Sequence, residues 1–110
     1  MSATHKMVYV DDSGIVEKPI QVRQGEYLSL STTGSLAGTA ALEYSPDYTP
    51  LRPDAGEWLP VLDDEGVAVT YTAGAANPLP IEGMVGWFRL APGNITGADG
   101  VVYADRGYRR

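Results

Sequence analysis

Glycine and proline interrupt this chain so often that it has no room for a long helix. Thirteen glycines and eight prolines are spread over 110 residues. Breaks recur about every eight to twelve residues, the spacing typical of short strands in a β-sandwich or barrel. No stretch shows apolar residues at helical spacing without a Gly or Pro inside it. The sequence therefore predicts an all-β protein.

Between these breaks, apolar and polar residues alternate with the period of two that a half-buried strand requires. The alternation is clearest where Val67, Val69 and Tyr71 share one face. Pro19 marks its own segment as an edge or bulged strand. Connections are too short for parallel crossovers, which predicts antiparallel pairing. The expected strands cover residues 7–10, 15–23, 27–33, 39–45, 57–62, 67–73, 85–91 and 100–104, with a short apolar segment at 79–81.

Length and composition favour one globular domain. A chain of 110 residues with 44% hydrophobic residues can bury one thin core. The predicted fold is a single-domain antiparallel β-sandwich of about eight strands, either jelly-roll or immunoglobulin-like. Residues 1–6 are expected to form a flexible N-terminal arm, and residues 105–110 a basic C-terminal tail.

Charge and hydropathy narrow the range of partners. The net charge of −6 disfavours binding to nucleic acid, whose phosphates would be repelled. No apolar run approaches the roughly 18 residues of a membrane span, and the first residues lack the apolar region of a secretory signal. Three of the eight basic residues, Arg106, Arg109 and Arg110, lie in the last five positions. An acidic body with a basic tail suggests a protein partner with complementary patches, while a frayed, solvated terminus is the commoner reason for such a tail.

The residue types that carry chemistry are sparse. There is no cysteine, and His5 is the one histidine, so neither a thiolate site nor a triad is expected. Acids at 11–12 and 63–65 each precede a glycine and indicate β-turns more than calcium loops. A glycosidase pair drawn from Asp47, Asp54 and Glu57 would need a cleft that a small core hardly provides. We therefore expect no enzyme activity, no cofactor and no metal.

The segment ALEYSPDYTPLRPDAGEWLPV, residues 41–61, is the most unusual in the chain. It is predicted to be two strands joined by a long loop, which the prolines at 46, 50 and 53 stiffen. Trp58 is the best candidate for an exposed aromatic platform. Such a stiff loop could contact a protein neighbour, or its aromatic side chains could stack on a sugar.

Residues 38–91 also carry a familiar succession of motifs. GTAALEYSPD is followed by GEWLPVLDDEG, VAVTYTAG and LPIEGMVGWFRLAPG. This succession resembles small β-sandwich virion proteins of tailed bacteriophages, of the capsid decoration or cement type. The loop SPDYTPLRPDAG and the ending RGYRR depart from the pattern.

The resemblance implies a structural protein on the capsid surface of a virion assembled in the host cytoplasm. Its partners would be the major capsid protein and other copies of itself, in a homo-oligomer such as a trimer. Val85, Trp87 and Leu90 could then serve the core or the trimer contact. The alternative is a carbohydrate-binding or adhesin-like module on a phage tail or cell surface, with Tyr44 joining the platform. The candidate partner-binding residues are Arg106, Tyr108, Arg109, Arg110, Tyr48, Arg52 and Trp58.

Overall fold

The protein is an all-β sandwich. A computed structural model describes residues 2–52, 56–74 and 85–108. Every described element is a strand, and all strand pairs are antiparallel. The strands are β1 (Ser2–Asp11), β2 (Gly14–Glu17), β3 (Ile20–Val22), β4 (Glu26–Gly34), β5 (Thr39–Ser45), β6 (Leu59–Pro60), β7 (Thr70–Thr72), β8 (Gly86–Leu90) and β9 (Gly100–Tyr108).

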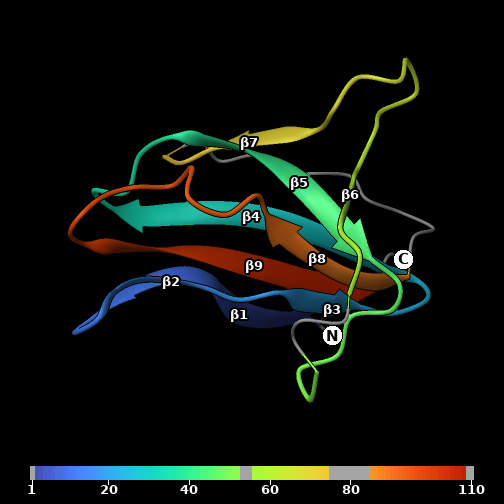
Figure 1. Cartoon of the computed structure of the whole chain (residues 1–110), viewed down its shortest axis with the longest axis horizontal. Helices are drawn as coiled ribbons and strands as arrows, with labels where there is room; N and C mark the ends of the chain where they lie inside the picture. The colour runs from blue at the N-terminus through green and yellow to red at the C-terminus, as the bar shows by residue number, and fades with distance from the viewer. Residues whose placement is uncertain (1, 53–55, 75–84, 109–110) are drawn as a thin grey trace.

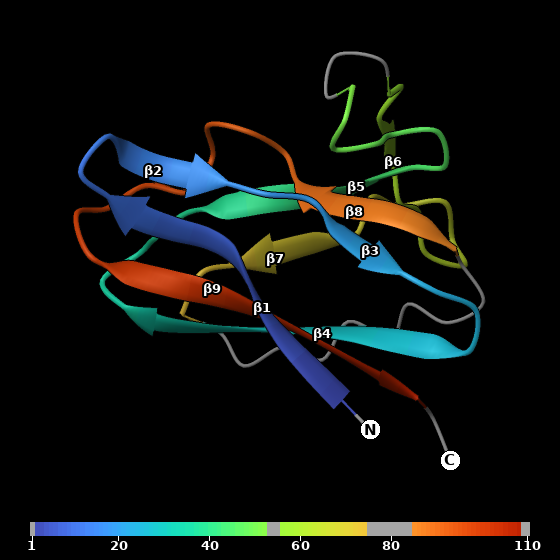
Figure 2. The same cartoon turned by 90° about the horizontal axis from the view of Figure 1, so that it is seen from below.

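The strands form two sheets packed face to face (Figures 1 and 2). One sheet has the order β2-β1-β9-β4, and the other has the order β3-β8-β5-β6, with β7 also paired to β5. Early strands pair with late ones, since β9 lies between β1 and β4 in one sheet, and β8 lies between β3 and β5 in the other. Pairing of early strands with late ones is typical of a jelly roll. In a constant-type immunoglobulin domain the first and last strands lie in different sheets, whereas here β1 and β9 are neighbours in one sheet. The strand order thus favours the jelly-roll alternative.

The core lies between the sheets and follows the alternation of the sequence. Leu28 and Leu30 of β4 are buried, as are Leu42 of β5 and Phe88 of β8, each at 0–2% exposure. Tyr71, the one fully buried tyrosine described, reaches across to β4, where its hydroxyl hydrogen-bonds Thr32. The other buried apolar residues are Met7, Val8, Ile20, Val22, Leu36, Ala40, Val61, Leu90, Ile95, Val102 and Ala104.

The segment 15–23, expected as one strand, is two strands in different sheets. β2 pairs with β1, and β3 pairs with β8. The Lys18 N–H still donates to the Met7 carbonyl at 2.8 Å. Pro19 has no N–H with which to continue that ladder, so the chain leaves the first sheet there. Pro19 therefore marks a crossing between two edge strands, as one of the two alternatives predicted, and not a bulge.

The two ends of the chain also differ from expectation. Residues expected as an arm and a tail lie in β1 and β9, which pair with each other from Ser2↔Gly107 to Tyr9↔Val101. β9 is also paired with β4 along its whole length. Residues 105–108 are thus the end of a central strand and not a free basic tail. Backbone pairing on both sides outweighs the charge of this segment.

The predicted strands 57–62 and 67–73 are much shorter than expected. Of the first, only β6 is a strand, and of the second, only β7. The chain between them is held by the Asp63 carboxylate, which accepts hydrogen bonds from the Glu65 and Val67 N–H groups, both at 2.9 Å. The turn predicted for the acids at 63–65 is confirmed, and Gly66 supplies its positive φ of 80°. The segment 79–81 lies outside the described residues.

Candidate functional site

The long loop after β5 is closed at its base by side-chain hydrogen bonds. The Ser45 hydroxyl donates to Asp47 Oδ1 at 2.7 Å, and the Tyr48 N–H donates to Ser45 Oγ at 3.1 Å. From the far leg of the loop, the Glu57 N–H donates to the same Asp47 oxygen at 3.1 Å. The Ser45 hydroxyl and this N–H hold the pKa of Asp47 below its ordinary value. Asp47 thus serves to close the loop as an ionised carboxylate.

A glycine allows the two legs to meet. A Cβ on Gly56 would lie 2.9 Å from Tyr48 Cβ and 3.0 Å from Ser45 Oγ. No larger residue fits there unless the legs move apart. The close approach places residues 48 and 58 side by side, although they are ten positions apart in the sequence.

Three aromatic side chains gather where the loop meets β8. The Tyr48 ring lies 5.2 Å from the Trp58 ring and 5.2 Å from the Trp87 ring, at interplanar angles of 52° and 63°. These are tilted and edge-on contacts, a favourable geometry for aromatic pairs. The three rings form a folded cluster and not a flat platform.

Arg89 of β8 connects this cluster to the sheet. It lies directly opposite Glu43 of β5, and its Nε donates to Glu43 Oε1 at 2.8 Å. Its guanidinium lies 4.3 Å from the centre of the Trp58 ring, a cation–π contact. Arg89 therefore fixes one face of Trp58 and occupies it.

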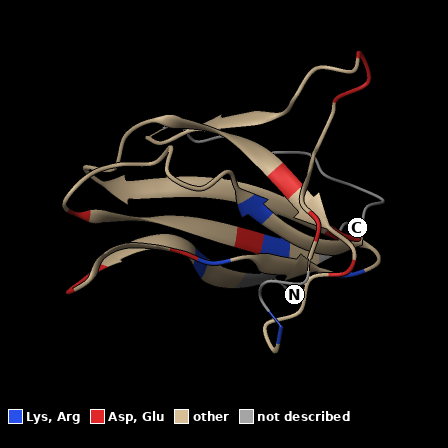
Figure 3. Cartoon of the chain, in the orientation of Figure 1, with Lys and Arg blue, Asp and Glu red and all other residues tan. Residues whose placement is uncertain are grey.

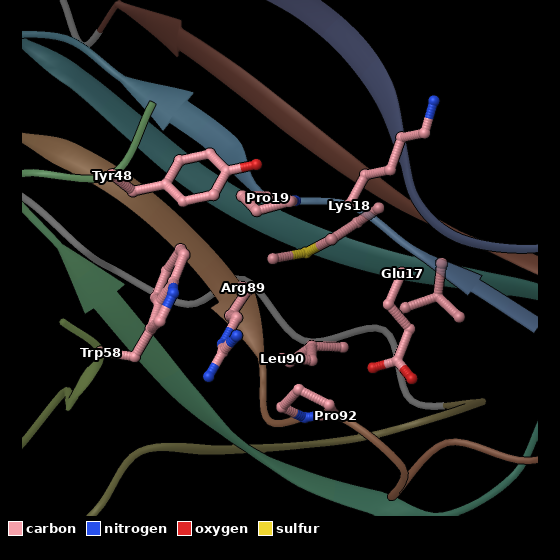
Figure 4. Close-up of a pocket in the computed structure, with 10 residues that line it drawn as sticks. Glu17, Lys18, Pro19, Tyr48, Trp58, Arg89, Leu90 and Pro92 are labelled. Carbon is pink, nitrogen blue, oxygen red and sulfur yellow. The ribbon is translucent and has the colours of Figure 1, made fainter. Parts of the chain in front are cut away.

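A cavity of about 260 Å³ opens beside the cluster, between the β2–β3 crossing and β8. Figure 4 shows Tyr48 and Trp58 at one end of it, and Glu17 and Lys18 at the other, with Arg89 beside the Trp58 ring. Glu17 Oε1 accepts a hydrogen bond from the Gly93 N–H, while its Oε2 is buried without a partner. The remaining lining is Met7, Val8, Pro19, Leu90 and Pro92.

The lining of this cavity has the character of a binding pocket. An apolar floor with a carboxylate, an ammonium group and aromatic rings at its rim can hold an amphipathic group. Among the described residues, no group of three or more His, Asp or Glu side chains could hold a metal ion, and no helix is long and apolar enough to cross a membrane.

The predicted site residues are scattered. Tyr48 and Trp58 meet in the cavity wall. Tyr44 lies apart from that wall and packs its ring 6.1 Å from that of Phe88. Arg52 is exposed in a turn in which its N–H donates to the Thr49 carbonyl.

The four basic-tail candidates also separate. Arg106 is half-buried in β9, and its Nη1 donates to the Gln21 carbonyl of the other sheet. Tyr108 ends the same strand, opposite Glu26. Arg109 and Arg110 lie outside the described residues.

Sequence reasoning missed Glu17 and Arg89 as members of the site. A weak signal existed for Arg89, because a lone cation in the apolar run VGWFRLA must find a partner when half-buried. Nothing local marks Glu17, which reaches the cavity only because the chain crosses between sheets at Pro19.

Comparisons with protein-family models, with curated proteins and with solved structures found no match.

Proposed function

We propose that this chain is a structural, non-catalytic virion protein of a tailed bacteriophage, which decorates the capsid by binding the major capsid protein and other copies of itself. The sequence resemblance suggests this role, and the β-sandwich fold agrees with it. A decoration protein needs a stiff scaffold and loops that contact a neighbour, with no reaction site.

The proposal rests mainly on the positions of the exposed apolar side chains. Five large hydrophobic residues of the described chain are exposed, and four of them fall within residues 51–67. Leu51 is 91% exposed, Leu62 55% and Val67 57%, while Leu59 is 40% exposed on the edge strand β6. Four exposed apolar side chains within one short segment make that segment the candidate interaction surface.

The shape of this segment also suits contact. In Figure 1 the turn after β6 projects upward, while residues 46–52 project downward from the same side of the sandwich. The upper turn ends in the acids at 63–65, seen as a red tip in Figure 3. We infer that the described residues 46–52 and 56–67, which form these two projections and the chain between them and which we call the contact segment, touch the capsid or a neighbouring copy.

Repetition over a lattice would compensate for small individual contacts. When several copies are joined in an oligomer such as a trimer, each further attachment becomes intramolecular and total affinity rises steeply. The exposed edge of β6 is available for contacts between copies, as is Val85, which lies just before β8 and is 56% exposed.

The test is the number of copies of this chain in purified virus particles, measured by quantitative mass spectrometry. Decoration of the lattice requires copies on the order of hundreds per particle. About a dozen copies would instead place the chain at a portal or tail, and absence from particles would overturn the proposal.

A variant pair sharpens this test. Leu51→Asp should reduce attachment to particles without lowering thermal stability, because the side chain touches little within its own fold. Thr33→Asp changes an exposed residue outside the contact segment and should leave attachment unchanged. Equal attachment of both variants would exclude the tip of the loop from the interface.

The cavity beside Trp58 favours a second candidate, a carbohydrate-binding module. Aromatic rings beside a free carboxylate oxygen can hold a sugar through stacking and hydrogen bonds to its hydroxyls. The tilt of the Tyr48 and Trp58 rings, with Arg89 over Trp58, leaves one small pocket in place of an extended platform. A glycan array with the wild-type chain and Trp58→Ala tests this candidate, which fails if glycan binding is absent or unaffected.

A further inference from the structure

A second cavity, of about 200 Å³, is lined by residues from both sheets, including His5 of β1 and Arg106 of β9. Figures 1 and 2 show that β1 starts and β9 ends at the same end of the sandwich. This second cavity shares only Pro19 with the lining of the first cavity. Its walls come from both sheets. They are His5, Pro19, Ile20, Gln21, Trp87 and Arg106.

Two nitrogen-bearing side chains enter this cavity from neighbouring strands of one sheet. His5 of β1 lies opposite Ala104 of β9, and Arg106, two positions further along, lies opposite Leu28 of β4. Ala104 and Leu28 are fully buried, so this face of the sheet is the inner one. His5 and Arg106 therefore project between the sheets as diagonal neighbours.

Both side chains hold buried nitrogen atoms without a partner. Arg106 Nη1 donates to the Gln21 carbonyl, but its Nε has no hydrogen-bond partner. His5 Nε2 is also buried and unpaired. Two such groups at the wall of one cavity are unusual, since buried polar atoms nearly always find partners.

Within the described part of the chain, no carboxylate forms an ion pair with Arg106. The one ion pair found there joins Arg89 and Glu43. Asp105 directly precedes Arg106 in β9 and therefore faces the opposite side of the sheet. Glu26 is buried nearby on β4 and uses its Oε1 to accept from the Arg23 N–H. A half-buried cation left without a counter-charge is costly.

We propose that this cavity is a receptor for a carboxylate. With Nη1 engaged, the edge of the guanidinium formed by Nε and Nη2 is the one that binds a carboxylate through two parallel hydrogen bonds. His5 Nε2 can donate a further bond, and Trp87 with Pro19 forms an apolar wall against the carbon chain that bears the carboxylate.

The carrier of the carboxylate is an Asp or Glu side chain of the protein partner, and this part of the inference rests on the proposed function. Anion binding in the cavity does not rest on it. The chain's net charge of −6 opposes a nucleic-acid phosphate as the occupant. Arg106 thus contributes to partner binding through a preformed cavity and not through a free tail.

The test is a titration of the full chain with sodium acetate, followed by two-dimensional NMR at constant ionic strength adjusted with chloride. We expect saturable shifts of the Arg106 Nε–H, the Trp87 indole N–H and the Gln21 backbone N–H. A second arm with inorganic phosphate distinguishes a carboxylate site from a general anion site, and binding tighter for phosphate than for acetate would overturn the assignment. Acidic and amidated forms of a Glu-containing peptide show whether a protein side chain can enter.

Variants keep the proposal falsifiable even if one of them folds poorly. Arg106→Lys keeps the charge but loses the planar fork, and should weaken acetate binding about tenfold or more. His5→Ala should weaken it by a smaller factor. Arg89→Lys, in the other cavity, is the matched control and should leave the titration unchanged. No saturable shift in the wild type, or an equal titration in Arg106→Lys, would overturn the proposal whatever the copy number in particles.

Discussion

The β4–β9 pair and the contact segment differ in the interactions that hold their backbones in place. β4 and β9 are paired without a break from Glu26↔Tyr108 to Gly34↔Gly100. The contact segment has a short ladder at Leu59–Pro60, a few separate backbone hydrogen bonds such as that from the Val61 N–H to the Leu42 carbonyl, and side-chain bonds from Ser45, Asp47 and Asp63. A ladder backed by a buried face contributes to the stability of the whole domain. A loop closed by its own side chains can change with little effect on that stability.

The largest expected effect is in the core. Phe88→Ala removes a fully buried ring and should lower the free energy of unfolding by about 3–5 kcal/mol, because the cavity it leaves cannot collapse completely. Leu51→Ala, at a 91% exposed position, is the matched control and should be close to neutral. Denaturant titration measures both variants. Similar losses would mean that the loop tip packs into the domain.

A smaller effect is expected where the loop legs meet. Gly56→Ala places a Cβ 2.9 Å from Tyr48 Cβ, and should cost about 1–2 kcal/mol because packed groups must shift. The Trp58 fluorescence should change, since its ring contact with Tyr48 is altered. Gly66→Ala is a useful comparison, because its Cβ would meet nothing within 4 Å and only its φ of 80° opposes the change. An unchanged Trp spectrum in Gly56→Ala would show that the legs are already free to separate.

The Arg89–Glu43 pair links β8 to β5 beside the contact segment and should show a weak coupling. Its side chains are 28% and 22% exposed, so solvent screens the interaction. A double-mutant cycle with Arg89→Met and Glu43→Gln should give about 0.5–1 kcal/mol. Arg89→Met should also change the Trp58 spectrum, because the cation–π contact is lost. A coupling near zero would mean that Arg89 contributes through its contact with the Trp58 ring and not through the ion pair.

The smallest effect concerns pH. The pKa of Asp47 is lowered from 3.8 by the Ser45 hydroxyl and then by the Glu57 N–H. A lowered pKa means that the bonds favour the ionised form, so their contribution is complete above pH 3.8 and is lost as the pH falls through the folded-state pKa. The Tyr48 and Glu57 N–H signals in NMR should therefore shift together below pH 4.

A control separates this loop from general acid effects. Asp47→Ala should abolish the coupled shift, while the Ser13 N–H should still respond, because Asp11 has its own lowered pKa from the Ser13 hydroxyl and N–H. If the Tyr48 and Glu57 signals do not move below pH 4, closure of the loop does not depend on the carboxylate.

The fold could be predicted where local pattern and tertiary environment agree. The alternation in 27–33 and 39–45 matches β4 and β5 closely, and two turns recognised from Asp and Gly, at 11–14 and 63–66, are present. Alternation works there because those strands have one face on the core. The same alternation predicts strands at 57–62 and 67–73 that are longer than those observed. Between them, the Asp63 carboxylate accepts hydrogen bonds from backbone N–H groups that a longer ladder would use.

The candidate site was only partly predictable. Tyr48 and Trp58 stand out in the sequence because a stiff loop carries them, and the structure brings them together. Arg106 was singled out for its charge but was assigned to a free tail. Its surroundings were hidden, because pairing of β9 with β1 and β4 is a long-range event that no local pattern records.

The sequence by itself determined that the chain is all-β, antiparallel and divided into short strands, because Gly, Pro and period-two alternation act within a few residues. Only the tertiary structure decided which strands share a sheet, that Pro19 marks the crossing between sheets, and that Glu17 and Arg89 border one cavity while His5 and Arg106 border another. The physical reason is that each cavity is walled by segments far apart in the chain, whose contact depends on burying one common core.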